Sequence, residues 1–175
     1  KLEHWHKTLR ILLAQVLLGL GELERSAWLA QTLMTEYDKD RWLRAKMQLV
    51  LGDVATLRND TLQALRYYHE SLKTVLPTRS VPALLLRLSC LVKALVSSGQ
   101  GRLAERIVAY CKDAKNYRRM SFVDRQTLNK FTLSPQVELT DWRSLEPEEV
   151  ALLVVSDVDY ILQTKNQGEK PPALA

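Results

Sequence analysis

Three breaks in the hydrophobic pattern recur at nearly constant spacing, and they constrain the fold more than any other feature. Each break closes an apolar segment with Gly or Asn, at Gly21, Asn59 and Gly99, and the intervals between these residues are 38 and 40 positions. Glycine and asparagine tolerate the left-handed backbone conformation that ends many helices. On both sides of each break, apolar residues recur at three- and four-residue intervals, the period of an α-helix. The sequence therefore predicts three antiparallel helix pairs in tandem.

The apolar residues at helical intervals are expected to form the buried faces of these helices. In the second pair, Trp42, Ala45 and Leu49 begin such a series. The first segment is the most apolar of all, and its periodic residues are Leu9, Leu12, Leu13, Val16, Leu17 and Leu20.

Prolines and carboxylates set the remaining boundaries. Pro77 ends the second pair because proline cannot continue a helix, and Ser80 is an expected N-cap for the helix that follows. A basic stretch after Cys111, which runs to Met120, leads to a short helix predicted at about 123–131 and a loop at 133–145. Glu146-Pro147-Glu148-Glu149 then predicts the start of a last helix, since proline suits its first turn and carboxylates favour the positive end of its dipole.

The second pair carries the pattern of a known family. Gly52 lies in the middle of its first helix, Asn59 at its turn, Ala64 at the expected helix crossing, Tyr68 beyond the crossing and Pro77 at the exit. In these residues the chain resembles the tetratricopeptide-repeat (TPR) proteins. The resemblance implies a right-handed solenoid in which small residues at the crossing let two helices approach closely.

The other pairs depart from this pattern. In the first pair Ser26 occupies the position of the crossing alanine, and in the third Val92 replaces the small residue in mid-helix. The order of the later segments, including Arg106-Ile107-Val108-Ala109-Tyr110, Trp142 and Leu145-Glu146-Pro147, is similar to the C-terminal sensor region of bacterial signal-transduction ATPases and LuxR-like regulators. That resemblance implies a platform for a partner or an effector.

The expected fold is therefore all-α. About three TPR-like helix pairs occupy residues 1–120, helices in 121–165 pack on or cap the solenoid, and residues 166–175 are predicted to be disordered.

Catalytic and metal-binding patterns are missing from the sequence. It contains no glycine-rich phosphate loop, no Gly-x-Ser-x-Gly and no Cys-x-x-Cys. His4 and His6 are two residues apart, which places them on different faces of a helix, and His69 is expected at the surface. We therefore expect no enzyme activity, no metal and no cofactor.

Two further features bear on location. No apolar run approaches the roughly 20 residues that span a bilayer, so no membrane contact is expected. Cys90 and Cys111 lie in apolar helical contexts, which is typical of free thiols in a reducing cytoplasm, or in a nucleus if the source is eukaryotic. A disulfide requires that their helices face each other.

The repeats predict a protein-interaction scaffold or adaptor. Stacked helix pairs curve around a groove lined by the first helix of each pair. A basic lining favours an acidic peptide or a partner's negatively charged helix. The polar residues expected on the groove side are Gln15, Lys46, Arg87 and Lys93.

Charge asymmetry leaves an alternative function open. Residues 136–175 carry a net charge of −5 and residues 1–135 a net charge of +10. A nucleic-acid-binding helical repeat would use the basic face within 102–125. The acidic segment is instead expected to dock on the basic body, where the last helix caps the open end of the solenoid in preference to filling its groove. The expected basic-face residues are Arg102, Arg106, Lys112, Lys115, Arg118 and Arg119.

The heavily apolar first helix leaves a question about assembly. Self-association into a homodimer accounts for the pattern, and so does a preceding repeat.

Overall fold

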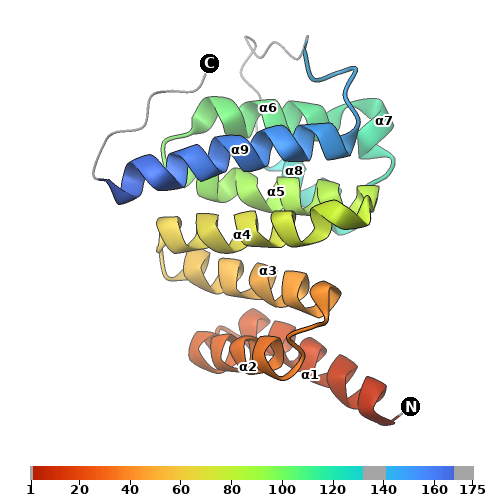
Figure 1. The fold of residues 1–175 in the computed structure, drawn as a ribbon, viewed down its shortest axis with the longest axis vertical. Helices are drawn as coiled ribbons and strands as arrows, with labels where there is room; N and C mark the ends of the chain where they lie inside the picture. Colours follow the sequence, from red (N-terminus) through yellow and green to blue (C-terminus); the bar gives the residue numbers. More distant parts are fainter. Residues whose placement is uncertain (1, 132–140, 168–175) are drawn as a thin grey trace. The chain divides into compact units, whose positions relative to one another are not determined.

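A computed structural model describes residues 2–131 and 141–167, and every regular element in this part of the chain is a helix (Figure 1). The prediction of an all-α fold is confirmed. The chain divides into two compact units, residues 1–74 and 75–175, which are described separately below. Residue 132, residues 133–140 of the predicted loop and 168–175 of the predicted tail lie outside the described residues.

The first unit is built from two helix pairs. Helix α1 spans Leu2–Gly19 and α2 spans Leu23–Glu36, and these two pack against each other. Helix α3 spans Arg41–Leu57 and contacts both α1 and α2. Helix α4 spans Thr61–Val75 and ends at the division between the units.

The second unit contains the third pair and the C-terminal helices. The 3-10 turn η1 (Leu76–Thr78) leads into α5 (Val81–Ser97), which packs against α6 (Gly101–Lys112). The short helices α7 (Ala114–Tyr117) and α8 (Phe122–Asn129) follow, and α9 (Pro147–Asn166) lies alongside α5 (Figure 1). The last two helices begin within a residue of their predicted positions.

All three predicted breaks adopt the same turn. Gly21, Asn59 and Gly99 have φ angles of 77°, 58° and 83°, so the predicted left-handed conformation is confirmed. The amide that follows each break donates to the carbonyl oxygen five positions earlier, for example from Glu22 to Leu17 at 2.9 Å, and the equivalent distances after Asn59 and Gly99 are also 2.9 Å. This bond is the signature of the Schellman helix ending. Repetition of one turn at regular spacing makes the three pairs structurally equivalent at their tips.

Close packing in the second pair depends on Gly52 of α3. A Cβ atom added at Gly52 would lie 2.4 Å from Cε1 of Tyr68 on α4, which is far inside van der Waals contact. The Tyr68 hydroxyl donates to Oδ1 of Asp53 at 2.6 Å, and Ser71 Oγ donates to the Ala45 carbonyl at 2.8 Å. These contacts tie α4 to α3 along its length.

The first pair accommodates its exception to the repeat pattern through a hydrogen bond. Ser26 of α2 is fully buried, and its Oγ donates to the carbonyl oxygen of Ala14 on α1 at 2.8 Å. A serine can therefore replace the crossing alanine, because its hydroxyl has a partner inside the crossing.

Helix α9 buries most of its predicted apolar side. Val150, Val154, Val158 and Ile161 are completely buried, whereas Leu153 is 44% exposed. At its start, the backbone amide of Glu146 donates to Oε2 of Glu149 at 2.7 Å, which is half of a capping box. The carboxylates at the start of the predicted last helix therefore serve its N-terminus.

Some side chains differ from expectation. His69 is only 1% exposed, because it lies within the wide buried stripe of α4, so the prediction of a surface histidine was wrong. Cys90 and Cys111 form no disulfide within the described part of the chain, and burial raises the pKa of Cys111 to about 12. No helix in the described part of the chain combines the length and the apolar character needed to cross a membrane.

Candidate binding surface

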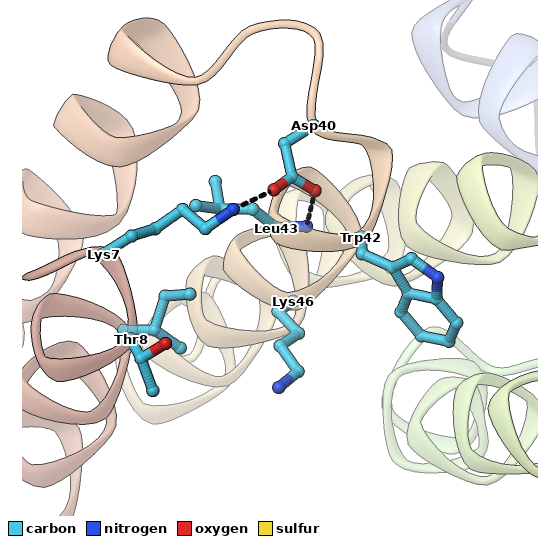
Figure 2. A pocket seen from close by; sticks show the side chains of 7 residues that line it. Lys7, Thr8, Asp40, Trp42, Leu43 and Lys46 are labelled. Atoms are coloured by element: carbon cyan, nitrogen blue, oxygen red, sulfur yellow. Dashed lines mark hydrogen bonds and ion pairs between the residues drawn. The ribbon is translucent and has the colours of Figure 1, made fainter. Parts of the chain in front are cut away.

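A hollow of about 360 Å³ lies between α1 and α3 in the first unit (Figure 2). It is built where the middle of α1 faces the first turns of α3. The residues that line it are Lys7, Thr8, Ile11, Asp40, Trp42, Leu43 and Lys46.

One wall of the hollow is held by an ion pair. Asp40 is the N-cap of α3, and its Oδ1 accepts from the Leu43 amide at 2.9 Å, while its Oδ2 lies 2.5 Å from Nζ of Lys7 (Figure 2). Partial burial of this carboxyl acts to raise its pKa, but the hydrogen bonds from Leu43 and Lys7 outweigh burial and hold the pKa of Asp40 below its usual value. The Lys7 ammonium also lies 5.6 Å from the ring centroid of Tyr37. The pair therefore fixes α1 against the start of α3.

The other wall carries an indole and a lysine one helical turn apart. Trp42 is 47% exposed, and Lys46, four residues later, is also exposed. Among the described residues no carboxylate pairs with Lys46, and its side chain extends separately from the Lys7–Asp40 pair in Figure 2. The hollow therefore combines apolar surface from Trp42 with an available positive charge.

A second, smaller hollow of about 240 Å³ lies in the same unit. It is bordered by residues of α2, α3 and α4, among them Gln31, Tyr67 and Arg58. The Arg58 guanidinium is already bonded to the Glu24 carboxylate. This hollow has no counterpart among the sequence predictions.

The four predicted groove residues fall in both units. Lys46 lines the larger hollow, and Gln15 is exposed on α1 on the same face as Thr8 and Ile11, beyond the lining. In the second unit Lys93 is exposed on α5, but Arg87 is only 2% exposed and donates to the Ala83 carbonyl at 3.3 Å. Burial lowers the pKa of Arg87. Contact of these residues with a partner stays a prediction.

The basic face is largely occupied by the chain itself. Arg106 bonds to Asp141 at 2.6 Å, and its guanidinium lies 4.3 Å from the ring centroid of Trp142. Lys112 donates to the Phe131 carbonyl at 2.8 Å. Near the start of α9, Lys115 bonds to Glu146.

Glu146 also lies 3.7 Å from Arg119, so three of the basic-face residues pair with Asp141 or Glu146. The hydrogen bond from Lys115 is the main cause that lowers the pKa of Glu146. Of the six predicted basic-face residues, Arg102, Lys112 and Arg118 pair with no carboxylate in the described part of the chain.

The ring of Trp142 packs on the buried side of the contact between Arg106 and Asp141. It is buried and meets Tyr110 edge to face, with 6.2 Å between ring centroids. The Tyr110 hydroxyl donates to the Leu145 carbonyl at 3.0 Å, and burial raises the pKa of Tyr110 to about 12, so the donor proton is present at neutral pH. The segment before α9 is therefore fixed by aromatic packing as well as by charge.

The described residues include no cluster of three or more His, Cys, Asp or Glu side chains suited to a metal ion. Comparison with family models, curated proteins and solved structures finds no match to the chain.

Proposed function

We propose that this chain is a protein-interaction module with TPR-like helix pairs, and that it binds an acidic segment of a partner protein in the hollow between α1 and α3. The observation that carries the proposal is the pairing of an exposed Trp42 with an available Lys46 on one turn of α3. No covalent step is involved, and recognition rests on shape and charge.

The chemistry of the hollow fits an acidic ligand that also has an apolar side chain. An exposed tryptophan supplies a large, rigid contact area, and tryptophan is among the residues that dominate interface energies. A cation beside it favours a carboxylate, since the charge-assisted bond adds direction to the apolar contact. Ile11 and Leu43 complete the apolar floor.

The size of the hollow limits what it holds. At about 360 Å³ it lies at the small end of ligand sites, which supports the seating of a few side chains from an extended peptide or a helix face. The paired Lys7–Asp40 wall is fixed before binding, so less ordering is required of the protein when a partner arrives.

The wider architecture belongs to the same proposal. The shared turns at Gly21, Asn59 and Gly99 support a right-handed solenoid of three repeats. A sensor role within a larger bacterial regulator rests on the order of the C-terminal segments alone.

Nucleic-acid binding has less support than protein binding. Four of the six cations on the predicted basic face contact groups of the chain itself, which leaves fewer of them for phosphates.

The proposal is tested with a displayed peptide library of graded charge. We expect acidic peptides with an aromatic or aliphatic residue to be enriched. Trp42→Ala should weaken their binding about 30-fold, because truncation of a hot-spot side chain costs about 2 kcal/mol of binding free energy. Lys46→Glu should weaken it about tenfold.

Lys39→Glu is the matched control, because it makes the same charge change at an exposed site of the same unit outside the hollow. Equal losses for Lys39→Glu and Lys46→Glu would mean that net charge alone drives binding, and that result refutes the assigned site. Capture of binding partners from cell extract, with and without nuclease and at two salt concentrations, distinguishes protein binding from nucleic-acid binding. Partners that are no longer recovered after nuclease treatment would favour nucleic-acid binding.

A further inference from the structure

Helix α1 exposes an apolar face along most of its length. Five large apolar side chains on this helix, together with Leu20 directly after it, are between 48% and 70% exposed to solvent. The residues of this face, called the α1 seam, are Trp5, Leu9, Leu12, Leu13, Val16 and Leu20.

The spacing within the seam is that of a coiled coil. Trp5, Leu9, Leu12 and Val16 follow one another at intervals of four, three and four residues, which is the a/d pattern of the heptad. The side of α1 that packs in the first unit is a different one, marked by Ala14 at 0% and Leu17 at 6% exposure. The helix therefore has two apolar faces, and the unit buries only one.

No charge interrupts the seam. Lys7 and Arg10 lie on the other side of α1, where they pair with Asp40 and Glu36. Two copies of the seam can therefore meet without burying a charge or placing like charges together.

The exposed area is close to that of a small specific interface. Trp5 would present about 200 Å² when fully exposed, and a Leu or Val side chain, whose full burial is worth up to about 3 kcal/mol at about 25 cal/mol per Å², would present about 120 Å². The exposed fractions therefore amount to roughly 470 Å² on one chain, a patch of the size that often marks an interaction site on a monomer. Two seams together would bury about 940 Å², close to the ~1,000 Å² of the smallest specific interfaces.

We infer that the chain forms a homodimer in which the α1 seams of two copies pack antiparallel about a two-fold axis. In this arrangement a and d positions of opposite helices share a layer, which places Trp5 against the partner's Val16 and Leu9 against the partner's Leu12. A parallel pairing would place the two large Trp5 rings against each other, and packing favours a large residue opposite a smaller one.

The inference is independent of the proposed function. Thr8 and Ile11 border the hollow, and at 100° per residue they point about 90° and about 150° away from the centre of the seam. Pairing through the seam therefore leaves the hollow open.

The oligomeric state is measured by light scattering on the intact chain at about 50 µM. The wild type should have twice the chain mass of 20.1 kDa, and Leu12→Glu should have the chain mass itself. Leu152→Glu is the matched control, because Leu152 on α9 is exposed to a similar extent (56%), and it should remain dimeric. Circular dichroism confirms folding, and Leu9→Glu replaces Leu12→Glu if that variant is unfolded. A monomeric wild type, or a dimer that persists in the folded seam variant, would overturn the inference.

The orientation is measured by oxidative cross-linking in a Cys90→Ser background. A mixture of Trp5→Cys and Val16→Cys chains should cross-link. Each variant alone should not, because the antiparallel register separates like positions by about 16 Å along the helix. Cross-linking of either variant with itself would refute the antiparallel arrangement.

Discussion

Replacement of Gly52 by alanine tests how closely α3 and α4 approach. The added methyl group would meet the Tyr68 ring at 2.4 Å from Cε1 and 2.6 Å from Cδ1. The ring is 2% exposed, and its hydroxyl is held by Asp53 at 2.6 Å and by Thr56 at 3.1 Å, so it cannot swing aside without losing these bonds. One of the two helices, or the ring, must therefore move.

The free energies can be compared. Alanine in a helix interior is favoured over glycine by about 1 kcal/mol. Overpacking of a well-filled site costs about 1–3 kcal/mol, and loss of the bond from Tyr68 to the Asp53 carboxylate costs about 1.5–3 kcal/mol. The clash therefore dominates, and we expect Gly52→Ala to lower the free energy of unfolding by about 2 kcal/mol.

Thermal and urea unfolding measure this loss. The melting temperature should fall by roughly 4–8 °C. Gly101→Ala in α6 is the control, since no atom lies within 4 Å of the site of its new Cβ, and it should be neutral or stabilising. The double variant Gly52→Ala/Tyr68→Leu should lose less than the sum of the two single variants, because the smaller side chain relieves the clash. If Gly52→Ala raised the melting temperature as Gly101→Ala does, the close approach of α3 and α4 would be refuted.

Three further predictions concern side chains in both units. Asp40→Asn keeps an N-cap but removes the charge opposite Lys7. Because the folded-state pKa of Asp40 is depressed, the stabilisation from its charge is present above about pH 4 and is lost as pH falls through the folded-state value. In urea unfolding, wild type and variant should differ by less than about 1 kcal/mol at pH 7 and converge on acidification, and a difference that grew on acidification would contradict this sign. Tyr110→Phe removes the bond to the Leu145 carbonyl and should cost about 1 kcal/mol while increasing amide exchange in 141–146, and unchanged exchange there would show that the bond does not hold this segment. Cys111, fully buried with its pKa raised to about 12, should resist a thiol reagent in the folded protein while Cys90 reacts first, and equal reaction rates would contradict the described burial.

Local features of the fold were predictable from the sequence. The turns at Gly21, Asn59 and Gly99 were found because a left-handed residue after an apolar periodic segment is a property of a few adjacent positions. Pro147 and the carboxylates beside it marked the start of α9 for the same reason. The closeness of Gly52 to Tyr68 followed from the repeat pattern to which both belong.

Tertiary features were not predictable to the same extent. Periodicity identified α1 as a helix, but it has apolar residues on two faces, and of the six periodic residues predicted for the first segment only Leu17 is buried. Trp42 was expected in a buried face and instead forms a wall of the hollow. The Lys7–Asp40 pair joins residues 33 positions apart, and no local pattern indicates such a contact. The role of Asp40 as an N-cap, by contrast, could have been predicted, because an aspartate directly before an apolar helical segment is a common N-cap signal.

The site prediction depended on assigning each polar residue to a helix face. Lys46 was identified from its spacing on α3 and does line the hollow. Arg87 was assigned in the same way, but α5 is buried over a wider arc than an amphipathic surface helix, and the side chain lies inside.

The most direct test of the proposed binding site uses the indole N–H signals of the four tryptophans in a ¹H–¹⁵N spectrum. Trp5, Trp28, Trp42 and Trp142 report on the α1 seam, α2, the hollow and the buried contact before α9. On titration with the tightest acidic peptide from the library, we expect the Trp42 signal to shift while the other three stay in place, and we expect Lys46→Glu to suppress the shift. A peptide that moves Trp142 or Trp5 instead, or a library that yields no binding peptide, would contradict the assignment of this hollow as the binding site.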